Sequence, residues 1–562
     1  TALLAIATNR RAVPPADGMP SIGITGRAIT ISTNATEPPF GPETIHENTT
    51  PSNHSPTAQP MAMRPPRRLM DLRVDATPPG NMNRPPDDEV DATGQSYDAA
   101  PDEVSHGVSA SVGLTWLATV MWVSVIAGEH IPGLGVLRGA SCFALLLLSV
   151  YWWRFRRWHV SLLMMLVVGT VGLVGGASAW QEVMVIDGAC SGTATVRTDP
   201  TWVGHGVGVV VQLHGKRYRV IAHGAPGAHL ANRLAGEQVA VKGTCAKTSG
   251  PYSRYDRITH VVGRMTVQSV SEEFSEGSIA VRAANRMRVA LRDGVALMPY
   301  KLQSLFAGLV IGDDRDQSRE MVNQFRASGL SHLCAVSGQN VAYLLAALSP
   351  LLRRLRRNSR FIAVLFILAW FVLLTRAEPS VLRAAVMAGL VAVNAASGAS
   401  MNARTILAST VIMLLLIDPM LAWSVGFALS VGATAGLAWL SARLGNIIGR
   451  HGMLASTLAA QVGTMPVSLF IFGYVPVVSL VANPLALWVA GMVMMVGLPL
   501  ALLASLITPL VPLVSWAMTI PVAWVAGVAR FCSEVSPHGL LNVGLWLCVA
   551  GGIWHRWRRT VA

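Results

Sequence analysis

The stretch "SGLSHLCAVSGQNVAYLLAALSPLLRRLRR", from Ser328 to Arg357, is apolar enough for a membrane segment and ends in a cluster of arginines. Polar side chains interrupt its first half at His332, Ser337, Gln339, Asn340 and Tyr343. Hydrocarbon offers these groups no hydrogen-bond partner, so they must face protein or water. The stretch therefore predicts a membrane helix with one polar side.

The rest of the chain has the composition of a membrane protein. Of its 562 residues, 52% are hydrophobic and only 13% are charged, and the mean hydropathy is +0.46. Apolar runs long enough to cross a bilayer recur through most of the sequence. They lie near 112–127, 134–153, 160–180, 330–352, 360–376, 380–397, 404–418, 421–440, 455–473, 477–499, 511–530 and 540–554. We expect a polytopic α-helical membrane protein with about 10–12 transmembrane helices.

Arginine clusters predict the orientation of these helices. "RFRRWH" (154–159), "RRLRR" (353–357) and "HRWRR" (555–559) flank apolar runs, and such clusters stay on the cytoplasmic side. Both termini are then cytoplasmic, and residues 181–270 lie outside. The chain must cross the membrane an odd number of times between 270 and 353, and the opening stretch is the best candidate for that crossing.

Residues 181–270 have a different pattern. Short β-branched runs such as "VGVVVQLHGKRYRVIAHG" alternate with glycine and proline, which is typical of a small β-barrel or sandwich. This segment carries ten Lys and Arg residues against four Asp and Glu residues, counted from Asp187 to Val270. Its two cysteines, Cys190 and Cys245, lie on the oxidising side, so either a disulfide or two buried thiols is compatible with the sequence.

These patterns divide the chain into five regions. We expect a disordered Pro/Ser/Thr-rich segment over 1–108, because such a composition cannot bury enough apolar surface to order itself. The others are three transmembrane helices over 109–180, the extracytoplasmic β domain over 181–270, an amphipathic helical connector over 271–328, and a transmembrane channel domain over 329–562.

The polar side of the opening stretch has two interpretations. At 100° per residue, His332, Gln339 and Tyr343 fall within about 40° of one another, with Asn340 beside them. This stripe either lines a hydrated path or forms hydrogen bonds that only hold the helix bundle together. The pair Ser337-Gly338 favours a kink or a close helix crossing.

Later runs contain further polar residues at membrane depth. Arg383 begins an apolar run and would be costly without a partner, for which Glu378 is the nearest candidate in sequence. Asn483-Pro484 interrupts another run, and broken helices at this depth usually line a cavity. These residues are either channel-lining or structural.

The sequence offers little sign of an enzyme or of a cofactor. It lacks the G-x-x-x-x-G-K-[ST] motif of nucleotide-binding loops, and it lacks the common zinc-hydrolase motifs. Asp313, Asp314, Asp316 and Glu320 are compatible with Mg²⁺, but such a cluster more often caps a helix. We expect no catalytic residues, no metal and no cofactor.

Several stretches resemble the ComEC family of competence proteins. They are "GLVIGDDRDQSREMVNQFRASGLSHLCAVSGQNVAYL", "EPSVLRAAVMAGL", "DPMLAWSVGFALSVGATAGL" and "AAQVGTMPVSLFIFGYVPVVSLVANPLALW", in family order over about 300–490. The usual second histidine of that family's "SGLHV" motif is Asn340 here. Many members also continue into a metallo-β-lactamase-like domain, which we do not expect in a chain that ends eight residues after Trp554.

The resemblance implies an inner-membrane channel that passes single-stranded DNA into the cytoplasm during natural transformation. It also implies an OB-like fold for the β domain. The implied partners are a DNA receptor and nuclease outside, an ATPase and single-strand-binding proteins inside, the lipid bilayer, and a second copy of the chain in a homo-oligomer. The residues expected to line or shape the path are His332, Ser337, Gly338, Gln339, Asn340, Tyr343, Arg383 and Asn483.

The basic β domain would meet DNA through phosphate contacts at Lys216, Arg217 and Arg219, with Trp202, Tyr218, Tyr252 or Tyr255 as candidates for base stacking. Two rival functions remain at this point. One is transport of another polyanionic or lipid-linked substrate. The other is a membrane-embedded enzyme that uses His332 and the Asp313–Asp316 cluster.

Overall fold

The computed structural model describes residues 101–130, 157–181, 187–250, 253–334, 337–398, 401–449 and 452–561, all of which fall in one compact unit. The expectations for residues 1–100, for the apolar run 134–153 and for Tyr252 lie outside the described residues. Residues 101–108, predicted to be disordered, instead form the first turns of α2 (Pro101–Gly128). Once the apolar part of a helix has formed, adding residues to its end costs little, which accounts for this extension.

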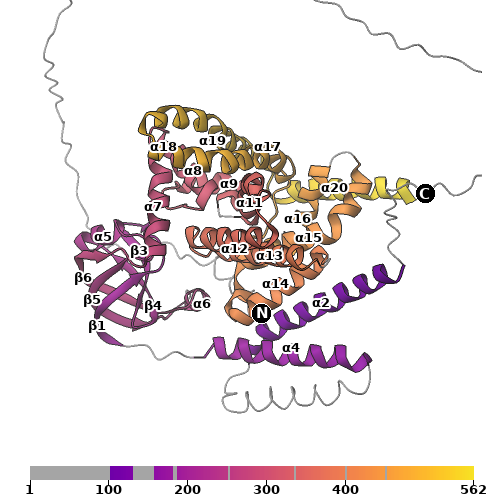
Figure 1. The fold of residues 1–562 in the computed structure, drawn as a ribbon, viewed down its shortest axis with the longest axis horizontal. Coiled ribbons are helices and arrows are strands. Elements are labelled where there is room, and N and C mark those ends of the chain that lie inside the picture. The colour runs from indigo at the N-terminus through magenta and orange to yellow at the C-terminus, as the bar shows by residue number, and fades with distance from the viewer. Residues whose placement is uncertain are drawn as a thin grey trace, which may run out of the picture. The chain divides into compact units, whose positions relative to one another are not determined.

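Helices dominate the described residues, as predicted (Figure 1). The N-terminal pair is α2 and α4 (Arg157–Ala179), and the helices that follow the β domain are α7 (Ile279–Asp293), α8 (Tyr300–Ile311), α9 (Arg319–Ala327), α10 (Ser331–Cys334), α11 (Gly338–Leu352), α12 (Arg357–Leu374), α13 (Pro379–Ser397), α14 (Ala403–Ile417), η1 (Pro419–Trp423), α15 (Val425–Ile448), α16 (Gly452–Phe472), α17 (Ser479–Met492), η2 (Val493–Gly497), α18 (Leu498–Leu506), η3 (Thr508–Leu510), α19 (Val511–Glu534) and α20 (Gly539–Val561).

Seven stretches among the described residues are long and apolar enough to cross a membrane. They include the continuous span Ser479–Leu506, which joins α17 to α18 through η2. Three further apolar helices, within α4, α8 and α14, are shorter. The chain is therefore a multi-pass membrane protein by length and composition, with fewer full-length spans in the described part than the 10–12 predicted. Large apolar side chains such as Phe366, Trp488 and Leu540 remain mostly exposed, as expected for surfaces that face lipid.

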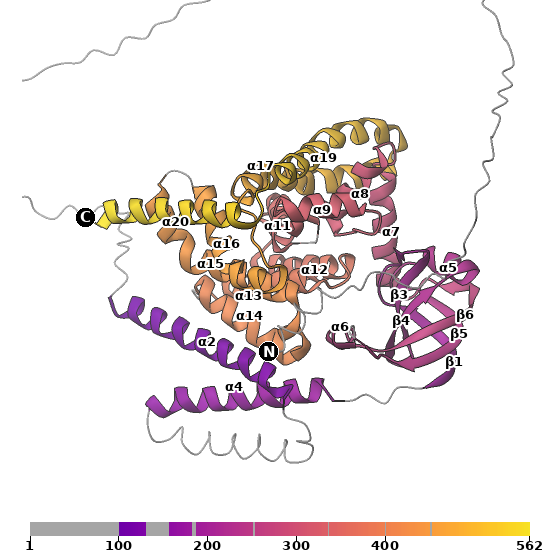
Figure 2. The ribbon, with the colours of Figure 1, turned by 180° about the vertical axis from the view of Figure 1, so that it is seen from behind.

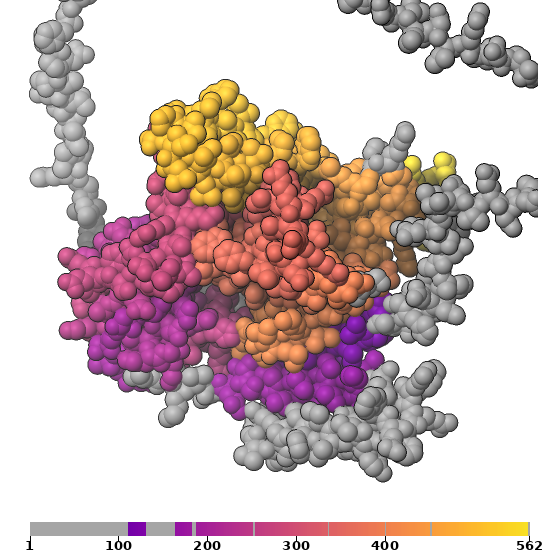
Figure 3. All heavy atoms as spheres, viewed as in Figure 1, coloured from indigo at the N-terminus to yellow at the C-terminus, as the bar shows by residue number. Residues whose placement is uncertain are grey.

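Small residues allow close approach between paired helices. A Cβ added at Gly436 in α15 would collide with the Ala459 carbonyl of α16, and one at Gly176 in α4 would collide with the Val125 carbonyl of α2. Membrane helices lack a hydrophobic driving force for association, so close backbone packing of this kind supplies much of their attraction. The atoms of the helices coloured salmon to orange pack closely on the face seen in Figure 3.

The extramembrane segment forms one six-stranded sheet. Its strands are β1 (Gly188–Val196), β2 (Thr201–Val203), β3 (Gly206–Leu213), β4 (Lys216–Ala222), β5 (Gln238–Lys247) and β6 (Val261–Ser275), in the order β1-β5-β6-β4-β3-β2. Because β1 pairs with both β5 and β3, five of the strands close into a ring (Figure 2). Only the β4–β6 pairing is parallel. The short helices α5 (Gly224–Ala231) and α6 (Ser253–Ile258) connect β4 to β5 and β5 to β6. The last strand runs to Ser275, five residues past the predicted boundary.

Alternating residues fill the inside of this ring. Val196, Val211, Tyr218 and Val220 are each at most 1% exposed. Tyr218 is thus a core residue rather than a base-stacking platform, because even positions of β4 point inward. Cys190 and Cys245 form a disulfide with a Cα–Cα separation of 5.8 Å, which confirms the bonded alternative.

Candidate functional site

The polar stretch that opened the sequence is a broken helix. α10 ends at Cys334 and α11 begins at Gly338, and Ser337 has extended backbone angles (φ −99°, ψ 161°). The 15 residues of α11 span about 22 Å, which is less than the roughly 30 Å of a hydrocarbon core. A break at this depth frees backbone groups that need protein or water partners. The start of α11 at Ser337 and Gly338, hereafter the helix break, is the centre of the candidate site.

Arg383 of α13 lies against the start of α11. A Cβ added at Gly338 would stand only 2.7 Å from the Nη2 atom of Arg383, so glycine makes room for the guanidinium. The Arg383 side chain is buried, with 6% of its surface exposed. The expectation that Glu378 would pair with it is not met, since no carboxylate lies within 4 Å of Arg383 among the described residues.

Two hydroxyls of α15 hold the Arg383 guanidinium instead. Nε donates to Ser430 Oγ at 2.7 Å, and Nη1 donates to Thr434 Oγ1 at 2.9 Å. The Thr434 hydroxyl donates in turn to the Ser430 carbonyl, which leaves its oxygen lone pairs free to accept from the arginine. Sequence reasoning missed both residues, although their spacing of four places them on one helix face.

The Asn340 side chain forms a hydrogen bond between two helices. Its Nδ2 atom donates to the Leu309 carbonyl of α8 at 2.9 Å, and its side chain is buried. That carbonyl lacks its usual partner because Gly312 ends α8 in a left-handed turn and the Asp313 amide bonds to Ala307. At this residue the geometry agrees with the bundle-holding interpretation of the polar stripe.

The other stripe residues differ from Asn340 in their surroundings. His332 and Gln339 are exposed. Tyr343 is half-buried and packs against Gly491 of α17, where a Cβ would stand 2.8 Å from the ring. Ser337 begins α11 without capping it through its side chain and donates to Asn340 Oδ1 at 3.3 Å.

Several side-chain amides, in the helices and in the loop between α8 and α9, have buried atoms without hydrogen-bond partners among the described residues. They are Oδ1 of Asn483, Oε1 of Gln461 and both polar atoms of Gln317. Gln461 donates from its other amide atom to Ser479 Oγ. Buried polar groups are nearly always satisfied, so these unsatisfied atoms point to water or substrate in this region. Of these three residues, only Asn483 was predicted from the sequence, because neither glutamine belongs to a recognisable motif.

A network of arginines and aspartates joins the β domain to the helices. Asp199, from the loop between β1 and β2, accepts hydrogen bonds from Arg288 of α7 at 2.9 Å and from Arg376 at 3.0 Å. Asp313, after α8, contacts the same Arg288 at 3.1 Å and Arg315 at 2.7 Å. Arg292 completes the arginine–aspartate network with Asp313 and Asp316.

The arginines of this network lower the pKa values of its buried aspartates. Burial alone would raise the pKa of Asp199, but the charges of Arg288, Arg376 and Arg315 outweigh it, and the pKa is lowered. The pKa of Asp313 is likewise lowered, because its hydrogen bond to Arg315 and the arginine charges outweigh burial. Asp313 and Asp316 are therefore engaged by arginines, and the described residues hold no group of three potential metal ligands.

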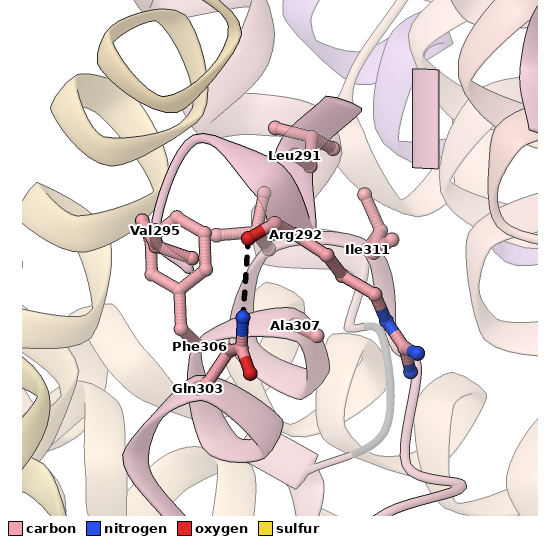
Figure 4. A pocket seen from close by; sticks show the side chains of 8 residues that line it. Leu291, Arg292, Val295, Gln303, Phe306, Ala307 and Ile311 are labelled. Carbon is pink, nitrogen blue, oxygen red and sulfur yellow. Dashed lines mark hydrogen bonds between the residues drawn. The ribbon is translucent and has the colours of Figure 1, made fainter. Parts of the chain in front are cut away.

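The connector helices α7 and α8 support this network without forming a ligand pocket. The hollow between them is lined mainly by apolar side chains such as Leu291, Val295 and Phe306, and it has no room for a water molecule (Figure 4). Gln303 donates to the Arg292 backbone carbonyl at 3.1 Å. Figure 4 shows the Arg292 guanidinium directed away from Val295 and Phe306.

On the β domain, the predicted phosphate-binding residues face α6. Arg219 forms a 2.7 Å ion pair with the buried Asp256, and Arg217 donates to the Thr259 carbonyl at 3.4 Å. Lys216 stands at the start of the same strand and is half-buried. Trp202 and Tyr255 are exposed by 68% and 60%, and the Arg219 guanidinium lies 5.7 Å from the Tyr255 ring centre.

Comparisons with known proteins match the region that contains the helix break. Residues 309–557 match the family model described as "Competence protein". The chain is 27% identical to "ComE operon protein 3" of Bacillus subtilis (strain 168) over 237 residues, 42% of this chain and 30% of that protein. It is 25% identical to "Uncharacterized protein YcaI" of Escherichia coli (strain K12) over 310 residues, 47% of this chain and 41% of that protein.

The matched segments thus cover less than half the length of either relative. No solved structure matches the chain. The resemblance predicted from the sequence motifs is confirmed for the C-terminal region, which matches the Competence-protein model.

Proposed function

We propose that this chain forms a membrane channel that passes single-stranded DNA into the cytoplasm during natural transformation. The observation that carries the proposal is the helix break, where Arg383 is buried among apolar helices and no carboxylate of the described residues contacts it. A polyanion needs a path with polar groups and few fixed negative charges. The match to the Competence-protein family covers the same residues.

His332 and Gln339, both exposed, would line the path. Asn483 and Gln461 would face it with their unsatisfied amide oxygens. Asn340 and Tyr343 would shape it from behind, through their contacts with α8 and α17. Ser337 and Gly338 would set its width at the helix break, since any larger residue at 338 would displace Arg383.

The β domain would receive DNA outside the membrane. Its five-strand ring, with one parallel pairing and a helix between β4 and β5, agrees with an OB-type barrel, a fold used widely for single strands. Lys216, Arg217 and Arg219 would contact phosphates, and the exposed rings of Trp202 and Tyr255 would stack on bases.

The proposal includes a location and partners. The chain would lie in the bacterial inner membrane with both termini in the cytoplasm and residues 181–270 outside. A receptor and nuclease outside would deliver the strand, and a cytoplasmic ATPase and single-strand-binding proteins would pull it in. We propose neither a catalytic residue nor a cofactor.

A clean deletion tests the function directly. DNA uptake should be lost in the deletion strain and return with the full chain, while lipid and polymer composition stays normal. Lost uptake together with altered lipid-linked or polymer chemistry would favour the rival transporter. Normal uptake in the deletion strain would refute the channel.

The role of the β domain has its own test in the purified full chain. Arg219 cannot be neutralised alone, because Asp256 would keep a buried charge, so the variant combines Lys216→Gln, Arg217→Gln, Arg219→Gln and Asp256→Asn. If all three cations contact phosphate, the slope of log affinity for oligothymidylate against log salt should fall by about two units. Asp256→Asn alone is the matched control, and an unchanged slope in the combined variant would exclude this strand as the receiving surface.

A further inference from the structure

Arg383 is a buried cation, and its remaining donor has no acceptor among the residues that the structure describes. Nε and Nη1 are used by Ser430, Thr434 and the Met387 sulfur. Nη2 makes none of these bonds and points to Gly338, and the described residues place no carboxylate within 4 Å of the guanidinium. A charge buried among apolar helices is costly unless an opposite charge compensates it.

The start of α11 adds positive potential at the same point. α11 is 15 residues long, and its first turn has no side-chain cap, since Ser337 donates to Asn340 Oδ1 instead of accepting from the helix. The free N–H groups at a helix start favour an anion, and a buried arginine directed at them would be repelled if nothing negative came between. Two independent features therefore favour an anion at Gly338.

The α15 hydroxyls keep the guanidinium ready for such a ligand. They accept from two of its nitrogens and fix its plane, while the Thr434 hydroxyl donates its own proton to the Ser430 carbonyl at 2.9 Å. A positioned guanidinium binds a phosphate oxygen more strongly than a free one, because less side-chain freedom is lost on binding. The arrangement suits one phosphate group at a time.

We infer that Arg383 and the first turn of α11 form a single-phosphate site inside the membrane, where each phosphodiester of the strand is held in turn. This inference rests on the proposed function, and it adds a substrate contact that selects a charged backbone. Arg383 would touch the substrate, whereas Ser430 and Thr434 would act only by positioning it. A single contact also allows release, because a strand held at many sites would not move.

Two variants of the full chain in proteoliposomes test the site. The readout is the entry of fluorescent oligothymidylate into the vesicles, compared with its methylphosphonate analogue, whose backbone is uncharged. Arg383→Gln should slow entry of the charged strand by about tenfold, the factor that one charge-assisted hydrogen bond supplies. Gly338→Ala should do the same with the charge retained, because its Cβ displaces Nη2. Neither variant should change entry of the neutral analogue.

Arg404→Gln is the matched control, because it removes one arginine of α14 that contacts Ala438 and Trp439 rather than the helix break. Its entry rates should equal those of the unaltered chain. If the unaltered chain passes oligothymidylate and both test variants pass it equally fast, the phosphate site is refuted while the channel stands. If the unaltered chain passes none, the proposed function itself fails. Gly338→Ala keeps the test decisive should Arg383→Gln not accumulate.

Discussion

Replacing Asp199 with asparagine should loosen the attachment of the β domain to the helices. Asp199 is 91% buried at its side chain and accepts from two arginines, Arg288 of α7 and Arg376 of the turn between α12 and α13. Breaking a buried ion pair by removing one partner costs about 3–5 kcal/mol, because the remaining charge stays desolvated. Asparagine keeps the size of the side chain and one acceptor oxygen, so the loss is mainly that of charge.

The matched control is Glu534→Gln, which removes a carboxylate from an exposed pair. Glu534 and Arg530 are 60% and 71% exposed, and a surface pair at this spacing contributes only about 0.3–0.5 kcal/mol. Thermal unfolding of the purified full chain should show a midpoint about 6–10 °C lower for Asp199→Asn, at about 2 °C per kcal/mol, and almost no change for Glu534→Gln. Equal midpoints for the two variants would refute the importance of the arginine–aspartate network.

Acid should reproduce this effect in the unaltered chain. The pKa values of Asp199 and Asp313 are lowered in the folded state, so their contribution to stability is complete above the unfolded pKa of about 4 and disappears as the pH falls toward the folded values. The free energy of unfolding should therefore change little through this network between about pH 5 and 8 and should decrease below about pH 4. In Asp199→Asn the free energy of unfolding should decrease less at low pH than in the unaltered chain. An equal decrease in the two chains would show that other groups cause the acid sensitivity.

Two further predictions concern topology and the polar helix. The topology test starts from a chain in which the exposed Cys548 is replaced by serine. A cysteine introduced at exposed Ser249 should react with an impermeant reagent in whole cells, whereas one introduced at exposed Ser359 should react only after lysis. The reverse labelling pattern would show that the predicted orientation is inverted. Gln339→Leu should lower DNA uptake per molecule at normal abundance, while Asn340→Leu should lower abundance, because it removes an interhelical hydrogen bond worth about 0.6–2 kcal/mol. Normal uptake per molecule in Gln339→Leu would remove that residue from the channel wall.

The sequence predicted the helices and strands better than it predicted the contacts between side chains. Apolar runs identified most membrane helices, and β-branched alternation identified the β domain, because both patterns follow directly from burial. The disulfide could be proposed because only two cysteines fall in the β-rich segment 181–270. The helical wheel of 331–352 was approximate, because Ser337 adopts an extended conformation and rotates α11 relative to α10.

Partners distant in the chain could not be found in this way. Glu378 was the nearest acidic residue to Arg383 in sequence, but the guanidinium instead contacts Ser430 and Thr434, which are 47 and 51 residues away. The aspartates after α8 resembled a metal site because two of their arginine partners, Arg288 and Arg292, lie on α7. Asp199 is likewise distant in sequence, 89 residues from Arg288. Hydrogen-bond partners are set by the packing of helices, which a single sequence does not encode in any local pattern.

Two kinds of buried arginine therefore occur in this protein, and their difference bears on function. Arg288 and Arg376 each contact an aspartate, so their charges are compensated within the chain and serve to hold the β domain in place. Arg383 is buried to nearly the same extent as Arg288 but is held only by two hydroxyls and a sulfur, so no acidic group of the described residues compensates its charge. A protein that only needed to join helices could use a neutral side chain there, since replacing buried charges with neutral groups often stabilises a fold. Retaining an uncompensated cation at a helix break is understandable if a passing anion completes the site.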